Sequence, residues 1–254
     1  MSAKYFDLIK HLTLREIKAR YKQSFLGFFW VVLNPFFQML ILSFVFSQVI
    51  RFSDLGVPYP IFLYAGLLPW VFFNTALSAA MGSLVENASL LKKIYFPREI
   101  LVLSVLLAKT FDFLLASLVF LILMLWFQVP IKPYMLLFFP IFAIQFLFTY
   151  AIALAISAMN LFYRDIQYLF NLILTLWFYL TPVIYAVEFF PEKYRWIFKF
   201  NPLSVFINAY REVLLAGGFP NWGSLSIGVI ISVVLFIFSF KMFKKLEGVF
   251  ADIV

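Results

Sequence analysis

The sequence predicts an all-α polytopic membrane protein with six transmembrane helices, and its composition is the first observation behind that prediction. Of 254 residues, 65% are hydrophobic and only 13% are charged, whereas soluble domains carry about 25% charged residues. So few charges cannot cover a surface that faces water, and most of the surface must therefore face lipid or other apolar parts of the chain. The second observation is a set of apolar stretches that are long enough to cross a membrane. The third is that segments outside these stretches have the patterns of short helices.

Residues 4–24 predict an interfacial helix that lies along the membrane surface. In its first turns Leu8 and Ile9 lie on one face, while Lys10 and His11 lie on another, as in an amphipathic helix. The pattern loosens later in the segment. The helix is therefore either an ordinary amphipathic anchor or one that carries a second surface for contact with protein.

Six apolar stretches are long enough to cross a bilayer as helices, which takes about 20 residues. Only the third stretch holds charges at membrane depth, Lys109 and Asp112, which lie three residues apart. That spacing puts them on one helix face, where they either neutralise each other or belong to an ion relay. Proline kinks or shortens a helix, an effect that we expect at Pro35, Pro69 and Pro140. The spans are expected at about 28–50, 61–84, 101–126, 135–161, 168–187 and 222–243, within a single transmembrane domain over residues 1–254.

The basic residues set the expected orientation. With the N-terminus in the cytoplasm, the cytoplasmic segments carry about twice as many lysines and arginines as the outer segments. Membrane proteins retain positive charge on the cytoplasmic side. We therefore expect both termini in the cytoplasm, and we attribute the net charge of +8 to topology instead of to a nucleic-acid-binding surface.

Between spans two and three, residues 85–100 predict a short cytoplasmic helix. Asn87 or Ser89 can cap this helix and Pro97 stops it. Its apolar side chains lie beside lysines, although a loop that only reverses the chain needs no apolar side chains. The segment is therefore either a helix that docks into a partner or a loop on the lipid surface.

Residues 188–217 predict a re-entrant helical hairpin on the outer side, between spans five and six. Pro191 can begin a first short helix, and Asn201 followed by Pro202 has the pattern of an N-cap and first helical residue for a second. The second helix is expected to end near Gly217. Two helices too short to span a bilayer can either cap a pathway or rest at the interface.

The sequence lacks the residues of the common catalytic sites. It has no G-x-x-x-x-G-K-[ST] phosphate loop, no cysteine and one histidine, His11. These absences exclude a P-loop for nucleotide, a cysteine nucleophile and a histidine-based zinc site. Acidic residues tend to sit beside basic ones, as Asp165 does beside Arg164. We therefore expect no enzyme, no metal and no cofactor in this chain.

Five motifs resemble signatures of the ABC-2 transporter family. In chain order they are RYKQSFLGFFWVVLNP (20–35), LLKKIYFPREILVLS (90–104), NLFYRDIQ (160–167), YLTPVIY (179–185) and NPLS (201–204). Together they cover essentially the entire chain, and five motifs in the expected order are far more specific than one. The resemblance is strongest for the polysaccharide-export permeases, in particular the Wzm-like permeases of O antigen, with teichoic-acid and capsule exporters as near relatives.

The resemblance implies the permease subunit of an ATP-driven exporter in the bacterial inner membrane. In that family a homodimer of permease chains binds two copies of a separate subunit, which holds ATP and Mg. A coupling helix docks on that subunit, and the matching residues here are Asn87, Leu90, Leu91, Lys92, Lys93, Ile94 and Tyr95. The outer hairpin would form a gate, with candidate residues Pro191, Tyr194, Asn201, Pro202, Tyr210, Arg211 and Glu212.

The resemblance implies that the substrate is a polysaccharide attached to a polyprenyl pyrophosphate, which is moved from the cytoplasm to the outer side. Membrane lipids are the further partners that we expect, and we expect no nucleic acid. Near the lipid entrance, basic side chains either attract the pyrophosphate or only orient the chain; they are Arg15, Lys18, Arg20, Lys22 and Arg98. Aromatic faces suit sugar rings, so the candidates for the channel lining are Trp177, Tyr179 and Tyr185. The alternatives are an ABC-2 exporter of another substrate (lipid, drug or teichoic acid), an ion-coupled secondary transporter and an embedded transferase.

Overall fold

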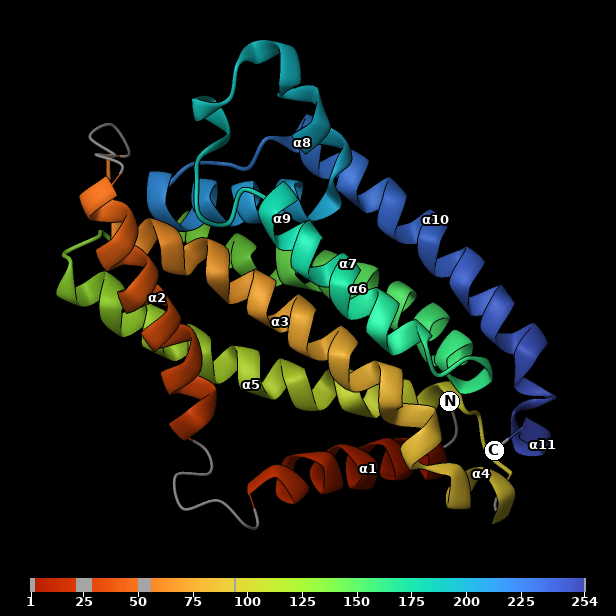
Figure 1. Cartoon of the computed structure of the whole chain (residues 1–254). Coiled ribbons are helices and arrows are strands. Elements are labelled where there is room, and N and C mark those ends of the chain that lie inside the picture. The colour runs from red at the N-terminus through yellow and green to blue at the C-terminus, as the bar shows by residue number, and fades with distance from the viewer. Residues whose placement is uncertain (1–2, 22–28, 50–55, 94, 254) are drawn as a thin grey trace.

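The computed structural model describes residues 3–21, 29–49, 56–93 and 95–253, and within these ranges every regular element is a helix (Figure 1). The all-α membrane class that the composition predicts is confirmed, because five helical segments are long and apolar enough to cross a membrane. They are α2 (Phe29–Val49), α3 (Tyr59–Glu86), α5 (Glu99–Trp126), α6 (Phe138–Phe162) preceded by the 3-10 turn η1 (Pro133–Leu137), and α10 (Trp222–Glu247).

Helix α7 (Ile166–Leu180) is apolar but short. Its 15 residues reach about 22 Å, less than the roughly 30 Å hydrocarbon core of a bilayer. The helical span expected over 168–187 is wrong at its outer end, because Thr181 precedes Pro182 and has an extended backbone with φ −109° and ψ 136°. Proline disfavours the helical conformation of the residue before it. The chain continues through residues 181–186 as a largely buried, non-helical segment.

Helix α3 forms the centre of the molecule, and most of its side chains are buried. It packs against α2, α5, α6 and α9 (Pro202–Arg211). Pro69 lies inside α3, and its carbonyl accepts a hydrogen bond from Gln145 Nε2 of α6 at 2.8 Å. The helices α2 and α3 continue past their prolines, whereas α6 begins at Phe138 and places Pro140 in its first turn. A missing N–H has little consequence there.

The helices α1 (Ala3–Tyr21), α4 (Ala88–Lys93) and α11 (Phe250–Ile253) lie at one end of the molecule (Figure 1). α1 packs on α5 and buries Ile9 and Leu12, and α11 contacts α4 and α6. Helices are therefore present where the sequence predicts an N-terminal interfacial helix and a short cytoplasmic helix, although α4 has only six residues.

The segment between α7 and α10 rises at the opposite end (Figure 1). Its second helix, α9, forms as predicted: the Asn201 side chain accepts a hydrogen bond from the Leu203 amide at 3.2 Å, and Pro202 is the first helical residue. A π-helical turn, η4 (Glu212–Ala216), extends α9 to Gly217, whose φ of 64° ends it. The first helix predicted from Pro191 is broken, because this exposed stretch gains little packing and short helices are marginal without it. In its place lie the 3-10 turn η3 (Glu192–Tyr194) and the five-residue helix α8 (Trp196–Phe200), and a further 3-10 turn, η2 (Val187–Phe189), precedes Pro191.

Candidate functional site

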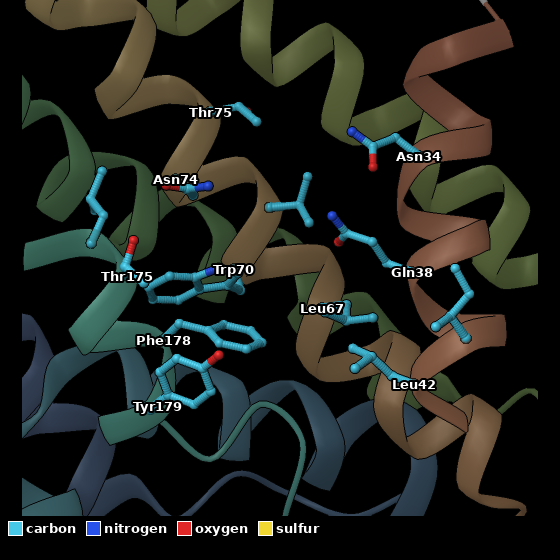
Figure 2. A pocket seen from close by; sticks show the side chains of 13 residues that line it. Asn34, Gln38, Leu42, Leu67, Trp70, Asn74, Thr75, Thr175, Phe178 and Tyr179 are labelled. Carbon is cyan, nitrogen blue, oxygen red and sulfur yellow. The ribbon is translucent and has the colours of Figure 1, made fainter. Parts of the chain in front are cut away.

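A hollow of about 470 Å³ lies between α2, α3 and α7 (Figure 2). Three side-chain amides enter it, from Asn34 and Gln38 on α2 and from Asn74 on α3. Asn34 and Gln38 are four residues apart and so lie on one face of α2. Within the described ranges none of these three amides forms a hydrogen bond with the protein. Each amide offers two donors and an acceptor, so the hollow presents unused hydrogen-bonding capacity between apolar helices.

Aromatic rings form one wall of the hollow. Trp70 of α3 and Phe178 of α7 lie with ring centroids 5.3 Å apart, and Tyr179 follows at 5.4 Å from Phe178 (Figure 2). The lining residues carry no charge. Neutral amides beside aromatic faces match the hydroxyl edges and apolar faces of a sugar ring.

The structure separates the three residues predicted to line a channel. Tyr179 lines the hollow and is 65% exposed. Trp177 faces the protein interior instead, where its Nε1 donates to Asn201 Oδ1 at 3.1 Å and its ring packs on Phe73. Tyr185 lies beyond α7, and its hydroxyl donates to the Tyr179 carbonyl at 2.7 Å. The amides of the hollow were missed by the sequence reasoning, although their positions inside uncharged stretches were a signal.

Above the hollow, Arg211 of α9 holds the non-helical segment that follows α7. Its guanidinium donates to the carbonyls of Pro182 and Val183 at 2.7 Å and of Tyr185 at 3.3 Å, and it lies 3.6 Å from the centroid of the Phe62 ring. Two further side chains complete this set, because Tyr59 donates to the Ile184 carbonyl and Asn201 to the Leu180 carbonyl. Where a helix ends inside the protein, its backbone carbonyls lose their helical hydrogen bonds and need other donors, because water cannot reach them.

The other candidate gate residues differ in environment. Tyr210 is buried and donates to Gln145 Oε1 at 2.9 Å, while Pro191 and Tyr194 are exposed. Glu212 Oε2 accepts a hydrogen bond from the Asn221 amide at 2.8 Å. Burial raises the pKa of Glu212, the Asn221 amide lowers it, and the nearby carboxylate of Glu188 raises it, with a net upward shift.

Only part of the predicted lipid entrance can be placed. Arg15 Nη2 donates to Asn87 Oδ1 at 2.6 Å, and Lys18 is exposed on α1. Arg98 lies elsewhere: its guanidinium donates to the Glu247 carbonyl and lies over the Phe250 ring. The side chain of Arg20 and the whole of Lys22 fall outside the described residues.

The predicted coupling residues surround α4. Leu91 is buried and Leu90 half-buried, whereas Lys92, Lys93 and Tyr95 are exposed, Tyr95 at 97%. Ile94 falls outside the described residues. The almost fully exposed Tyr95, just after the end of a short helix, is of the residue type enriched in protein interfaces.

Lys109 and Asp112 of α5 form an ion pair of 3.7 Å, with both side chains mostly buried. Helical spacing alone predicts this pairing. Mutual neutralisation is therefore sufficient to explain two charges at this depth.

A multi-pass helical protein with an uncharged, aromatic-walled hollow and charged helices at one end has the architecture of a membrane transport subunit. The chain belongs to the ABC-2 type transporter family, whose profile matches residues 7–215. Two O-antigen export system permease proteins of Klebsiella pneumoniae are 36% and 33% identical to it, over 98% of this chain and 95% of each relative. A polysialic acid transport protein of Escherichia coli is 21% identical over 94% of this chain and 93% of the relative. The family resemblance of the five sequence motifs is thus confirmed.

Proposed function

We propose that this chain is the channel-forming subunit of an ATP-driven exporter that moves a polysaccharide linked to polyprenyl pyrophosphate across the bacterial inner membrane. The observation that carries the proposal is the hollow, where three amides that form no hydrogen bond to any described residue face aromatic rings. A purely apolar cargo would leave those amides unsatisfied. The names of the relatives, which describe export of O antigen and transport of polysialic acid, support the same cargo class.

The energy for transport comes from a separate subunit that binds ATP and Mg, since this chain has no phosphate-binding loop of the P-loop type. The chain itself is a permease and not an enzyme. One copy of the ATP-binding subunit docks on each of the two permease chains, at the surface formed by α4 and the exposed Tyr95. This arrangement is supported by the family and by the position of α4 at the end of the molecule where α1 and α11 also lie.

A second copy of the chain completes the channel. Among the described residues, three helices bound the hollow, and two of them, α2 and α7, carry large exposed apolar faces with Ile41, Phe44, Leu172 and Leu176. Apolar faces beside a polar pathway suit an interface between two copies better than they suit an isolated chain.

The sixth crossing, which is the fifth in chain order, consists of α7 together with the buried segment 181–186. Non-helical backbone is tolerated at membrane depth where it is buried in protein, and the carbonyls held by Arg211 meet that condition. The hairpin acts as the outer gate and re-enters the membrane from that side. Both termini face the cytoplasm, as the distribution of basic residues favours.

The lipid-linked substrate enters near α1, where Arg15 and Lys18 attract the pyrophosphate. Its glycan then passes through the hollow, along the wall formed by Trp70, Phe178 and Tyr179. Aromatic faces allow sliding because they bind sugar rings without fixed charges.

The test reconstitutes the permease and its ATP-binding subunit in liposomes and measures ATP-dependent translocation of lipid-linked glycan. We expect Gln38→Leu and Asn74→Leu each to lower the translocation rate by roughly threefold to tenfold, because each variant loses one hydrogen bond to the glycan. Ser226→Leu on the exposed face of α10 is the control and is expected to retain the rate. Equal rates in all three variants would contradict a glycan path through the hollow.

A further inference from the structure

The starting observation is a hydrogen bond that joins α1 to the turn before α4. Arg15 Nη2 donates to Asn87 Oδ1 at 2.6 Å, across 72 positions of sequence. Within the described residues this is the one side-chain hydrogen bond that leaves α1. Elsewhere α1 is held by apolar contacts, through Ile9 and Leu12 on α5. Arg15 is therefore the polar connection between the membrane-surface helix and the docking helix.

Asn87 is the residue at which α3 ends and α4 begins. Its Nδ2 donates to the Ser83 carbonyl at 2.8 Å, which fixes its side chain to the last turn of α3. Its own carbonyl accepts from the amides of Leu90 and Leu91 at 2.9 and 3.2 Å, which starts α4. A force on the Asn87 side chain is thus transmitted to the first turn of α4.

Arg15 is placed to exchange Asn87 for a stronger partner. Its side chain is 46% exposed, and the same Nη2 also pairs with the Glu16 carboxylate at 3.0 Å, so an anion at the membrane surface can reach it in competition with both partners. A guanidinium binds phosphate oxygens in a charge-assisted, bidentate manner, whereas the amide oxygen of asparagine is neutral and accepts one bond. A pyrophosphate beside α1 therefore competes with Asn87 for Arg15.

We propose that Arg15 and Asn87 form a relay. Binding of the substrate pyrophosphate withdraws Arg15 from Asn87, and the loss of this hydrogen bond changes the position of α4 when the lipid-linked substrate is bound. The relay rests on the proposed function, because it needs both a pyrophosphate-linked substrate and an ATP-binding subunit on α4. Asn87 acts in it as a positioning residue, since it contacts Arg15 and the backbone of α4 but not the substrate. The immediate consequence is that ATP hydrolysis responds to the lipid through this bond.

Two substitutions of Asn87 should move that response in opposite directions. Asn87→Asp holds Arg15 through a charge-assisted bond, so the lipid-linked glycan concentration for half-maximal stimulation of ATP hydrolysis should rise by roughly tenfold. Asn87→Ser keeps a small polar side chain where α3 ends but is too short to hold Arg15, so that concentration should fall and basal hydrolysis should rise. Arg15→Gln breaks the bond from the other side and should raise basal hydrolysis while abolishing the response.

The assay uses the complete complex in nanodiscs and titrates a polyprenyl pyrophosphate-linked glycan, with inorganic pyrophosphate as a second arm for the headgroup alone. Lys10→Gln removes one charge from the exposed side of α1 without touching Asn87 and is the matched control. Co-purification of the ATP-binding subunit verifies that each variant is assembled. If the two Asn87 variants shift the half-maximal concentration in the same direction, or not at all, the relay is wrong. A wild-type complex that transports glycan but shows no lipid stimulation would overturn the relay and leave the proposed function intact.

Discussion

Arg211 shows how one residue allows a membrane helix to end early. Pro182 stops α7, and the carbonyls of the following turn would be unpaired if the Arg211 guanidinium did not donate hydrogen bonds to them. An unpartnered carbonyl costs about 1–3 kcal/mol when buried. A buried arginine is itself unfavourable, and the three carbonyls with the Phe62 ring offset that cost.

Replacing Arg211 should therefore destabilise the protein. We expect Arg211→Met to lower the free energy of unfolding by at least about 2 kcal/mol, since more than one buried carbonyl loses its partner. The matched control is Arg195→Met, because Arg195 also donates to two carbonyls but its side chain is 38% exposed. That control should stay within about 1 kcal/mol of the wild type. Thermal unfolding in detergent measures both, and equal losses would contradict the special role of Arg211.

Gly66 of α3 lies directly under this arginine. A Cβ at Gly66 would approach Arg211 Nη2 to 2.6 Å and the Val183 carbonyl oxygen to 2.7 Å. Because one of those atoms is backbone, we expect Gly66→Ala to lower the unfolding temperature. Gly82→Ala on the same helix meets only the flexible end of Glu86, so it should be neutral or slightly stabilising. A stable Gly66→Ala protein would show that the segment is held less tightly than the hydrogen bonds imply.

Glu212 should make the stability of the hairpin depend on pH. Its pKa is raised above 4.5 by burial, so the folded hairpin favours the protonated acid. The stabilisation is full below that ordinary value and is lost as the pH rises through the raised pKa. Limited proteolysis of residues 187–217 across this range should show increasing cleavage with pH, and Glu212→Gln should flatten the profile. Glu192→Gln, at a carboxylate that is 91% exposed, should leave the profile as it is.

At the level of elements, an ion pair connects the first turn of α5 to the last turn of α10. Lys244 Nζ lies 2.7 Å from Glu99 and 2.8 Å from Glu247, and Arg98 donates to the Glu247 carbonyl beside the buried ring of Phe250. This set connects α10 and α11 to the turn between α4 and α5. Movement of α4, the proposed docking helix, would therefore be transmitted to α10 as well as to α5.

We expect Lys244→Met to weaken this connection. The substitution leaves Glu99 and Glu247 facing each other, but solvent screening limits the loss to about 1 kcal/mol. Hydrogen exchange at residues 244–253 should increase, since α11 loses the support of α10. Lys241→Met, an exposed lysine one turn earlier, is the matched control. Faster exchange in both variants would indicate a general effect of lost charge instead of a specific bridge.

Helix α9 could be predicted from sequence because Asn201 and Pro202 carry a local signal for its start. The early end of α7 could have been predicted too, since Thr181-Pro182 is a local signal that a hydropathy pattern ignores. The hollow could not be predicted from the sequence. Averaging over a span hides single amides such as Asn34 and Asn74, and the face that each occupies depends on how α2 packs against α3.

For the whole molecule, the exposed faces of α2 and α7 predict a homodimer. The chain has no cysteine, so single cysteines can be introduced without a background. With a short bifunctional thiol reagent, Leu172→Cys on α7 should give a crosslinked dimer in membranes. Ile230→Cys on α10 should not, although the two native side chains are similarly exposed at 58% and 61%. Crosslinking through Ile230→Cys alone would place the dimer interface on the other side of the molecule.

The central claim is that two copies of this chain form a glycan channel driven by a separate ATP-binding subunit. The most direct measurement is translocation of polyprenyl pyrophosphate-linked glycan into proteoliposomes that contain the permease with or without that subunit. We predict glycan crossing only when the permease, the ATP-binding subunit and hydrolysable ATP are all present. Crossing at an equal rate without the ATP-binding subunit, or under an ion gradient alone, would contradict the account.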